Sequence, residues 1–267
     1  MTQTTSVLVC GYDEYASLWP TFKHSFDKYW DDCPWTVYFI TNHFNGPPGF
    51  QTIHTGKEIN WADKVLTALS RVDSEIIFWM MEDFWLTGPV QTLLLKRYSK
   101  LMQKNKNIAQ IRLLCPFDKE GRIIPEKELI DQTPFEGTLW YFKIDAEYRA
   151  TVSATMWRKE KLLKYLRDGM NPWLFEQQAS VLSGQAPEEL YLCTINPFTF
   201  PLCHLTNPYS KVECRDDVVT KGKWRKAAYE YTRKEGLLVN FRYHPDGTFN
   251  NEWEEWSTVS KPPSKII

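Results

Sequence analysis

The sequence predicts an α/β domain with a mostly parallel central sheet flanked by helices, and three observations support this class. Short runs rich in β-branched and aromatic residues recur from Ser6 to about Leu113. Segments with helical periodicity separate these runs. Alternation of this kind is typical of parallel strands whose crossover helices cover both faces of the sheet. The 267 residues are also enough to form one large domain with a substantial core.

Five apolar runs are the predicted strands, and the first of them, "SVLVC", ends at Gly11. They cover residues 6–10, 35–41, 50–55, 75–81 and 108–114. Three helices are predicted between them, at residues 15–29, 61–72 and 90–105, because apolar residues recur there every three or four positions. Pro20 falls near the start of the first helix, where a proline costs little.

The alternation stops after the fifth run. Residues 115–145 are polar and contain several prolines and glycines, so they are predicted to be long loops. A strand at 151–157 and helices at 158–169, from Asn171, and at 223–235 are expected after them. No repeat or linker is visible, which predicts one domain over 1–267. Its donor-binding half covers about 1–114, its acceptor-side half about 115–240, and its C-terminal tail about 241–267.

Composition excludes several classes of protein. The net charge of -1 gives no basic field that would attract nucleic acid. The six cysteines are scattered without a CxxC pair, which argues against a zinc site or a disulfide framework. Neither a signal peptide nor a transmembrane segment is apparent, so a cytoplasmic location is expected. Trp253 and Trp256 could place the tail against a membrane surface, but the acids beside them favour packing on the domain.

Two adjacent acids, Glu82 and Asp83, interrupt the apolar stretch "EIIFWMMEDFWLTGPV" directly after the fourth predicted strand. In open α/β sheets, ligands bind beyond the carboxyl ends of the strands. Paired carboxylates at such a position can hold a hard divalent cation, and the cation can neutralise a diphosphate. A helix cap or a plain acidic loop accounts for the pair equally well.

The segment "WADKVLTALSRVDSEIIFWMMEDFWLTGPV" resembles the GT-A class of nucleotide-sugar-dependent glycosyltransferases, in which an acidic turn called DxD follows a helix and an apolar strand. The resemblance extends from "VLVCGYDEY" to "TKGKW", although the turn here lacks the first Asp of DxD. It implies a GT-A-like fold, a nucleoside diphosphate sugar as donor, and Mn²⁺ or Mg²⁺ as cofactor. Asp83 would be the direct metal ligand and Glu82 its helper.

A second segment, "SATMWRKEKLLKYLRDGMNPWLFEQQAS", is similar to the acceptor side of bacterial polysaccharide glycosyltransferases of this class. The similarity implies that Glu176 is the catalytic base. An inverting transfer needs one carboxylate to take the proton of the acceptor hydroxyl as its oxygen attacks the anomeric carbon. The structural alternative for Glu176 is an acid near the start of a helix that complements the helix dipole.

The resemblance also implies donor contacts at Tyr12, Asp13 and Lys64. Without it, Asp13 reads as a turn former and Lys64 as a solvated helix lysine. Lys221 and Lys223 flank a glycine at the predicted start of a helix, where backbone N–H groups and two ammonium groups suit a diphosphate. A solvated basic turn is the alternative.

His204 falls where this class often supplies a third metal ligand, with His244 as a weaker candidate, although a lone histidine is more often a packed polar residue. The expected activity is transfer of a sugar from a nucleoside diphosphate sugar to a glycan or lipid-linked acceptor. One alternative is a sugar nucleotidyltransferase, but "CGYDEY" lacks the Gly-rich basic loop of such enzymes. The other is a non-catalytic carbohydrate-binding protein, which the aromatic content allows and the strand–helix alternation disfavours.

Overall fold

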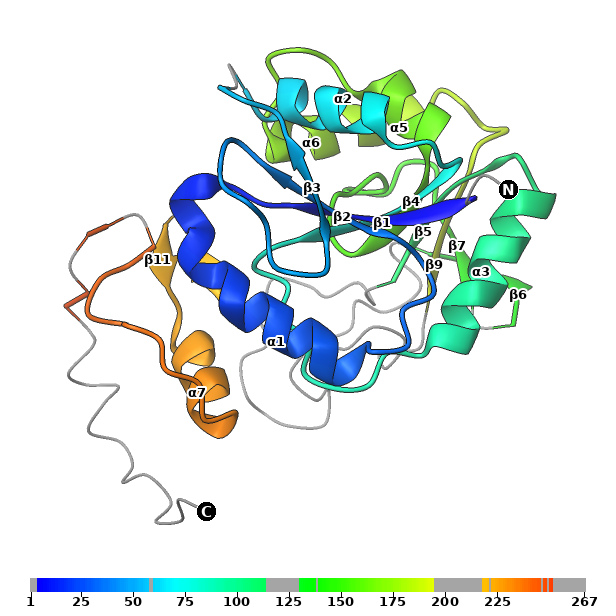
Figure 1. The fold of residues 1–267 in the computed structure, drawn as a ribbon. Coiled ribbons are helices and arrows are strands. Elements are labelled where there is room, and N and C mark those ends of the chain that lie inside the picture. Colours follow the sequence, from blue (N-terminus) through cyan, green and yellow to red (C-terminus); the bar gives the residue numbers. More distant parts are fainter. Residues whose placement is uncertain are drawn as a thin grey trace.

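In the part of the chain that the structure describes, nine strands form one sheet with helices on both faces (Figure 1). The structure is a computed structural model that describes residues 4–57, 60–113, 130–137, 139–194, 218–220, 222–245, 247–248 and 250–251. The strands are β1 (Thr5–Cys10), β2 (Val37–Thr41), β3 (Gln51–His54), β4 (Ile76–Met81), β5 (Ile108–Arg112), β6 (Ile130–Glu136), β7 (Leu139–Phe142), β8 (Thr155–Arg158) and β9 (Leu190–Thr194). A separate short hairpin pairs β10 (Val219–Thr220) with β11 (Lys223–Trp224).

The strand order is β3-β2-β1-β4-β8-β5-β9-β7-β6. From β3 to β4 all pairs are parallel, and β5 is parallel to β9. β8 and β7 run opposite to the other strands. The prediction of an α/β fold with a mostly parallel sheet is therefore confirmed. Because β8 is antiparallel to β4, the beginning of β8 lies at the same edge of the sheet as the end of β4.

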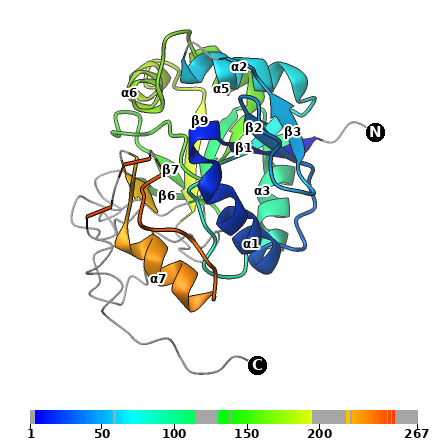
Figure 2. The same ribbon diagram turned by 60° about the vertical axis from the view of Figure 1, so that its left-hand side comes forward.

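Helices cover the two faces of the sheet (Figures 1 and 2). The helical elements are η1 (Asp13–Leu18, a 3₁₀ helix), α1 (Trp19–Tyr29), α2 (Trp61–Arg71), α3 (Thr92–Lys104), α5 (Lys159–Tyr165), α6 (Pro172–Ser183) and α7 (Lys226–Lys234). α2, α5 and α6 lie over one face, whereas α1 and α3 lie over the other. The side chains of β1 alternate between the two faces of the sheet. Val7 and Val9 belong to the core under α1, and Leu8 and Cys10 belong to the core under α2.

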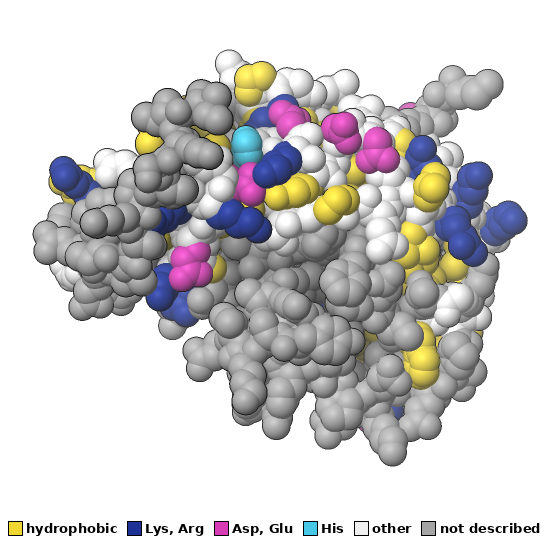
Figure 3. Space-filling view, turned by 90° about the horizontal axis from the view of Figure 1, so that it is seen from below, with side chains coloured by type: hydrophobic (Ala, Val, Ile, Leu, Met, Phe, Trp, Pro, Cys, Tyr) yellow, Lys and Arg dark blue, Asp and Glu magenta, His cyan; other side chains and the backbone are white. Residues whose placement is uncertain are grey.

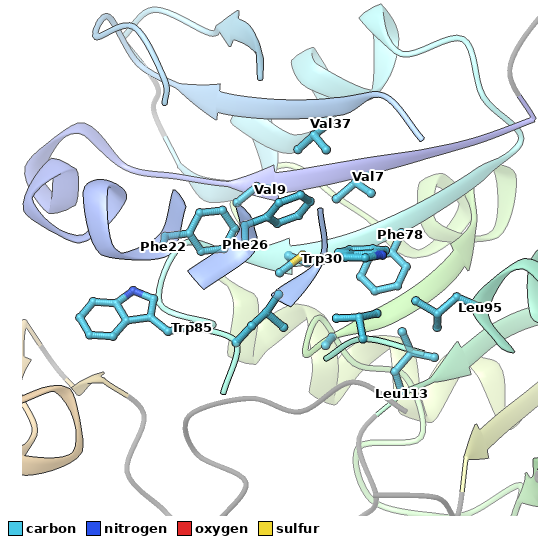
Figure 4. Packing of buried hydrophobic residues seen from close by; sticks show 14 of the residues in the cluster. Val7, Val9, Phe22, Phe26, Trp30, Val37, Phe78, Trp85, Leu95 and Leu113 are labelled. Carbon is cyan, nitrogen blue, oxygen red and sulfur yellow. The ribbon is translucent and has the colours of Figure 1, made fainter. Parts of the chain in front are cut away.

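Aromatic residues build much of the core between the sheet and α1 (Figure 4). The ring of Trp30 lies 5.0 Å from that of Phe78 and 5.2 Å from that of Phe26, measured between centroids. The Trp30 indole N–H donates a 3.0 Å hydrogen bond to the Thr92 hydroxyl at the start of α3. The high aromatic content is therefore used mainly for packing in this layer.

Asparagine caps begin two of the predicted helices. The Asn60 side chain accepts a hydrogen bond from the Asp63 N–H at the start of α2, and Asn171 accepts one from Leu174 at the start of α6. Pro172 occupies the first turn of α6. The start that the sequence predicted for α6 is confirmed.

Other expectations differ from the structure. Residues 115–145 were expected to be loops throughout, but β6 and β7 lie within this range at the far edge of the sheet. The final helix begins at Lys226, not at residue 223, because the preceding residues form the β10–β11 hairpin. The first helix begins as the 3₁₀ segment η1 and becomes α-helical only from Trp19.

Among the described residues, no helix is long and apolar enough to cross a membrane. Acidic and basic side chains are intermixed on the face shown in Figure 3, as the net charge near zero leads one to expect. Trp253 and Trp256 lie outside the described residues.

Candidate functional site

The ends of β1, β2 and β4 place three polar segments next to one another at one edge of the sheet. Cys10 at the end of β1 pairs with Ile40 of β2 and with Met81 of β4. The ladders continue one residue further, because Glu82 N–H donates to the Cys10 carbonyl at 3.3 Å. The acids predicted after β4 therefore lie beside the segment that follows β1, where Tyr12 and Asp13 were expected to meet the donor.

Glu82 is buried at this edge, with only 4% of its surface exposed. Burial raises the pKa of its carboxyl to about 8, and the neighbouring charge of Asp83 adds to the increase. The ammonium group of Lys64 and backbone hydrogen bonds at Glu82 and Tyr12 partly oppose this. Burial therefore favours the neutral form of Glu82, whereas a cation bound next to it would favour the charged form. Asp83 is half-buried.

Lys64 is also buried, with 2% exposure, which makes it quite different from a solvated helix lysine. Its Nζ lies 3.3 Å from the side-chain oxygen of Asn42 and 5.0 Å from the centre of the Tyr12 ring. The structure thus brings together Tyr12, Lys64 and Glu82, which the sequence placed in the donor site individually. An ammonium over an aromatic ring stabilises the position of both groups.

Asp13 organises the turn after β2. Its carboxylate accepts hydrogen bonds from the backbone N–H groups of Asn42, His43 and Phe44 at 2.7 to 3.1 Å. This is the turn-forming role that was the alternative to a nucleoside contact. Asn42 was not singled out from the sequence. Like Glu82, it is a polar residue directly after an apolar strand, so the same signal could have identified it.

Glu176 lies on α6 and faces the segment that leads into β8. One carboxylate oxygen, Oε1, accepts hydrogen bonds from the Thr151 hydroxyl at 2.6 Å and from the Val152 N–H at 2.9 Å. Among the described residues, no hydrogen bond occupies the other oxygen, Oε2. β8 begins at Thr155, which pairs with Trp79 of β4, so this segment enters the sheet at the edge where β4 ends.

The position of Glu176 on α6 is fixed by its neighbour Phe175, which is fully buried. The Phe175 ring lies 5.8 Å from Trp61 of α2 and 6.1 Å from Trp157 of β8. Because Phe175 packs in the core, Glu176 is directed along a different side of α6, toward Thr151. The sequence did not indicate Thr151, because no local pattern links it to Glu176, which lies 25 positions later.

Lys223, one of the two lysines predicted to grip a diphosphate, lies in a hairpin and not at a helix N-terminus. Lys223 is exposed in β11 and pairs with Thr220, and Gly222 adopts a φ of 79° that favours glycine. The next residue, Trp224, lies 6.0 Å from Trp85, two positions after Asp83. The hairpin is therefore held beside the acidic turn. Lys221 lies outside the described residues.

The two histidines considered as metal ligands have different outcomes. His204 lies outside the described residues. The ring Nδ1 of His244 accepts a hydrogen bond from the Trp224 N–H at 2.9 Å, which gives it a structural role in the hairpin. No cluster of three or more His, Cys, Asp or Glu side chains suited to a metal occurs among the described residues. A cation that bridges to a diphosphate needs only one or two carboxylates, so Asp83 fits this kind of site.

No family model and no curated protein matches the sequence. Several solved structures resemble the fold. Residues 1–349 of Staphylococcus aureus TarS match with a TM-score of 0.49 and 10% identity, over 96% of this chain and 79% of that one. The same TarS fragment in complex with UDP-GlcNAc matches with a TM-score of 0.43 and 12% identity. This match covers 67% of this chain and about half (53%) of that one.

Two further structures have comparable scores. The mannosyltransferase PcManGT from Pyrobaculum calidifontis, in complex with GDP-Man and Mn²⁺, matches with a TM-score of 0.45 and 11% identity over 74% of this chain and 56% of that one. A UDP-glucose pyrophosphorylase complexed with UDP-glucose matches with a TM-score of 0.46 and 12% identity, over 74% of this chain and 91% of that one. All these values are too low to assign a function to the chain.

Proposed function

We propose that this chain is a GT-A-like glycosyltransferase that moves a sugar from a nucleoside diphosphate sugar to a glycan or lipid-linked acceptor with inversion. The observation that carries the proposal is the anchored carboxylate of Glu176. Two hydrogen bonds fix its Oε1, and no hydrogen bond between described residues occupies its Oε2. A general base needs this combination of fixed orientation and an available oxygen.

In the proposed reaction, Oε2 of Glu176 takes the proton of an acceptor hydroxyl. The acceptor oxygen forms a bond to the anomeric carbon of the donor sugar as the bond from that carbon to the diphosphate oxygen breaks. The nucleoside diphosphate leaves with the bonding electrons. Thr151 and Val152 keep the carboxylate in place through their hydrogen bonds to Oε1.

The donor would occupy the opposite part of the same edge. The Tyr12 ring, held by the buried Lys64, would contact the nucleoside, and Asp13 would act indirectly by shaping the turn that contains Asn42. Lys223 would face the diphosphate from the hairpin, and Lys221 is predicted to assist it. Negative charge develops there as the donor bond breaks, so ammonium groups near it favour the transition state.

Asp83 would hold Mn²⁺ or Mg²⁺ at the acidic turn. When bound, the ion supplies positive charge that neutralises the departing group. Glu82 is buried next to Asp83, and its proposed contribution is to help Asp83 hold the ion. His204 remains a predicted additional ligand.

Thermal shift measurements with UDP, GDP, CDP and dTDP, each with and without Mn²⁺, test this proposal. A ligand that binds only the folded state raises the Tm. We expect one nucleotide to raise the Tm of the wild type in a metal-dependent manner and to lose this effect in Asp83→Ala. Asp73→Ala is the matched control, because Asp73 is an exposed acid just before β4.

Other outcomes separate the alternatives. Stabilisation that does not depend on metal would retain the transferase and assign the diphosphate to the lysines alone. Stabilisation by a nucleoside triphosphate in preference to every diphosphate would favour the nucleotidyltransferase. Stabilisation by none of these ligands would overturn the proposed donor site and favour a carbohydrate-binding protein without catalysis.

A further inference from the structure

A cavity of about 560 Å³ lies between α6 and the segment of residues 144–148. This volume falls within the range of small-molecule sites, roughly 300–1,000 Å³. Its apolar wall includes Ile144 and Val181, which are 46% and 68% exposed. Tyr148 also lines the cavity. Nothing in the function proposed above uses these side chains.

The cavity is built from rigidly connected parts. The buried Arg149 donates hydrogen bonds to the Ser183 and Glu189 carbonyls, which ties the segment to the end of α6. Tyr148 has a φ of 52°, a left-handed conformation that is uncommon for a residue other than glycine. Gly184 lets the two walls approach, because a Cβ there would lie 2.9 Å from the Ile144 carbonyl oxygen. The cavity is therefore a fixed feature of the fold.

Its polar groups suit hydroxyl-bearing ligands without negative charge. The carboxylates of Asp145 and Glu147 and the amide of Gln177 lie around the apolar wall. Among the described residues, neither carboxylate takes part in a salt bridge or hydrogen bond. Carboxylates and amides bind sugar hydroxyls or amines, and the Tyr148 ring can pack against the apolar face of a sugar ring. Both carboxylates would repel a phosphate or a uronic acid.

The cavity adjoins the proposed catalytic base. Ser180, which lines it, follows Glu176 by four residues, about 6 Å along the helix axis. The Ala150 N–H donates to the Ser180 hydroxyl at 3.1 Å, and the next residue, Thr151, holds the Glu176 carboxylate. The cavity and Glu176 therefore lie at neighbouring turns of α6.

From this geometry we infer that the cavity is a binding site for a saccharide that is neutral or carries an amine, and that it selects the acceptor. The inference rests on the proposed transferase function. A lipid pyrophosphate would not enter the cavity itself, because Asp145 and Glu147 would repel its charge. In a lipid-linked acceptor, only an uncharged or amino sugar unit would occupy it.

Two neighbouring glutamines provide a matched test. Gln177 lines the cavity, whereas Gln178 is exposed on α6 outside it. The variant Gln177→Trp should block the cavity, and Gln178→Trp adds the same bulk elsewhere. Fluorescently labelled wild type and both variants are applied to a glycan array of neutral, amino and acidic saccharides. Tm shifts with the four nucleoside diphosphates and Mn²⁺ are measured on the same samples.

We expect the wild type to bind neutral or amino saccharides, Gln177→Trp to lose at least about tenfold in affinity, and Gln178→Trp to remain within about twofold of the wild type. Binding of acidic saccharides alone, binding of none, or equal binding by both variants would overturn the inference. If saccharides bind as expected but no nucleotide raises the Tm, the cavity is a saccharide site and the transferase proposal is wrong. If a nucleotide raises the Tm and no saccharide binds, the transferase proposal stands and the cavity is not a saccharide site.

Discussion

The carboxylate of Glu176 on α6 lies 2.6 Å from the hydroxyl of Thr151, which precedes β8. This contact joins two segments that are 25 residues apart and fixes the orientation of the carboxylate. The contact shows that the Glu176 side chain is directed to the segment before β8. Two variants follow from this relationship.

The change Glu176→Gln keeps the size of the side chain and removes its basicity. We expect turnover of the donor to fall by about 10²- to 10⁴-fold, because that is the usual contribution of a positioned general base. The Tm shift caused by the nucleoside diphosphate should remain, since the proposed donor contacts, Tyr12 and Asp83, lie on other segments than Glu176. Release of nucleoside diphosphate in the presence of an acceptor saccharide measures turnover. Glu160→Gln, an exposed acid on α5, is the control.

The change Thr151→Val removes one of the two hydrogen bonds to Oε1 and leaves that of Val152. We expect kcat to fall by about tenfold, the equivalent of roughly 1.4 kcal/mol, with little change in KM for the donor. Thr151→Ser should restore kcat, because it restores the hydroxyl. If Thr151→Ser were as slow as Thr151→Val, the hydroxyl would not be what positions Glu176.

Lys223 provides a test of the hairpin as a diphosphate contact. It is exposed, so Lys223→Ala should change the free energy of unfolding by less than about 0.5 kcal/mol. We expect the affinity for the nucleoside diphosphate to fall several-fold, and the loss to shrink at high salt because charges at the surface are screened. Titration calorimetry at two salt concentrations measures both effects. Lys226→Ala, three residues later and equally exposed, should bind like the wild type.

The strands at the centre of the sheet were predictable because each is a continuous apolar run that is buried on both faces, as in "SVLVC" and "EIIFWMM". β6 and β7 were not, because β6 contains Pro134 and acids and forms only by pairing with β7 at the edge of the sheet. The hairpin before α7 was read as helix for a related reason. Its two-residue strands depend on the packing of Trp224 against Trp85 and not on local propensity.

The candidate site was predictable to the extent that it follows strand ends. Glu82 and Tyr12 meet because β1 and β4 are parallel neighbours, which the strand–helix alternation indicates. The sequence could not show that Lys64 is buried against Tyr12, or that Thr151 holds Glu176, because both contacts depend on how α2 and α6 lie over the sheet. The hydrogen bonds from residues 42–44 to Asp13 likewise join segments that are distant in the sequence.

Glu189 predicts how stability depends on pH. It is 1% exposed, and burial alone would raise the pKa of its carboxyl, but hydrogen bonds from Lys164 and Tyr165 outweigh burial and hold the pKa below 4.5. The unfolded state therefore binds more protons in acid, so the contribution of Glu189 is present above pH 4.5 and is lost as the pH falls through the lowered pKa.

The change Glu189→Gln should lower the free energy of unfolding at pH 7 by about 1–3 kcal/mol, because it leaves buried donors poorly matched. It should also make the loss of stability below about pH 4.5 less steep than in the wild type. Urea unfolding at a series of pH values from 3.5 to about 7 measures both effects. Glu188→Gln, at the adjacent exposed position, should follow the wild-type curve. Parallel curves for the wild type and Glu189→Gln would contradict the assignment.

Gly11 links the packing of the sheet to the candidate site, because it lies between the end of β1 and Tyr12. A Cβ at this position would lie 2.4 Å from the Phe39 ring and 2.9 Å from the Ile40 carbonyl oxygen. We expect Gly11→Ala to destabilise the protein by about 1–3 kcal/mol, as overpacking does in other cores, and to weaken nucleotide binding by displacing Tyr12.

A double-mutant cycle with Phe39→Leu identifies the cause of that loss. If the clash with the Phe39 ring dominates, the double variant should be more stable than the sum of the single losses predicts, by at least about 0.5 kcal/mol. Urea unfolding of the four proteins gives the coupling energy. Additive losses would assign the strain to the Ile40 carbonyl, which no side-chain change can relieve, and Gly11 would then be required by the backbone of β2 itself.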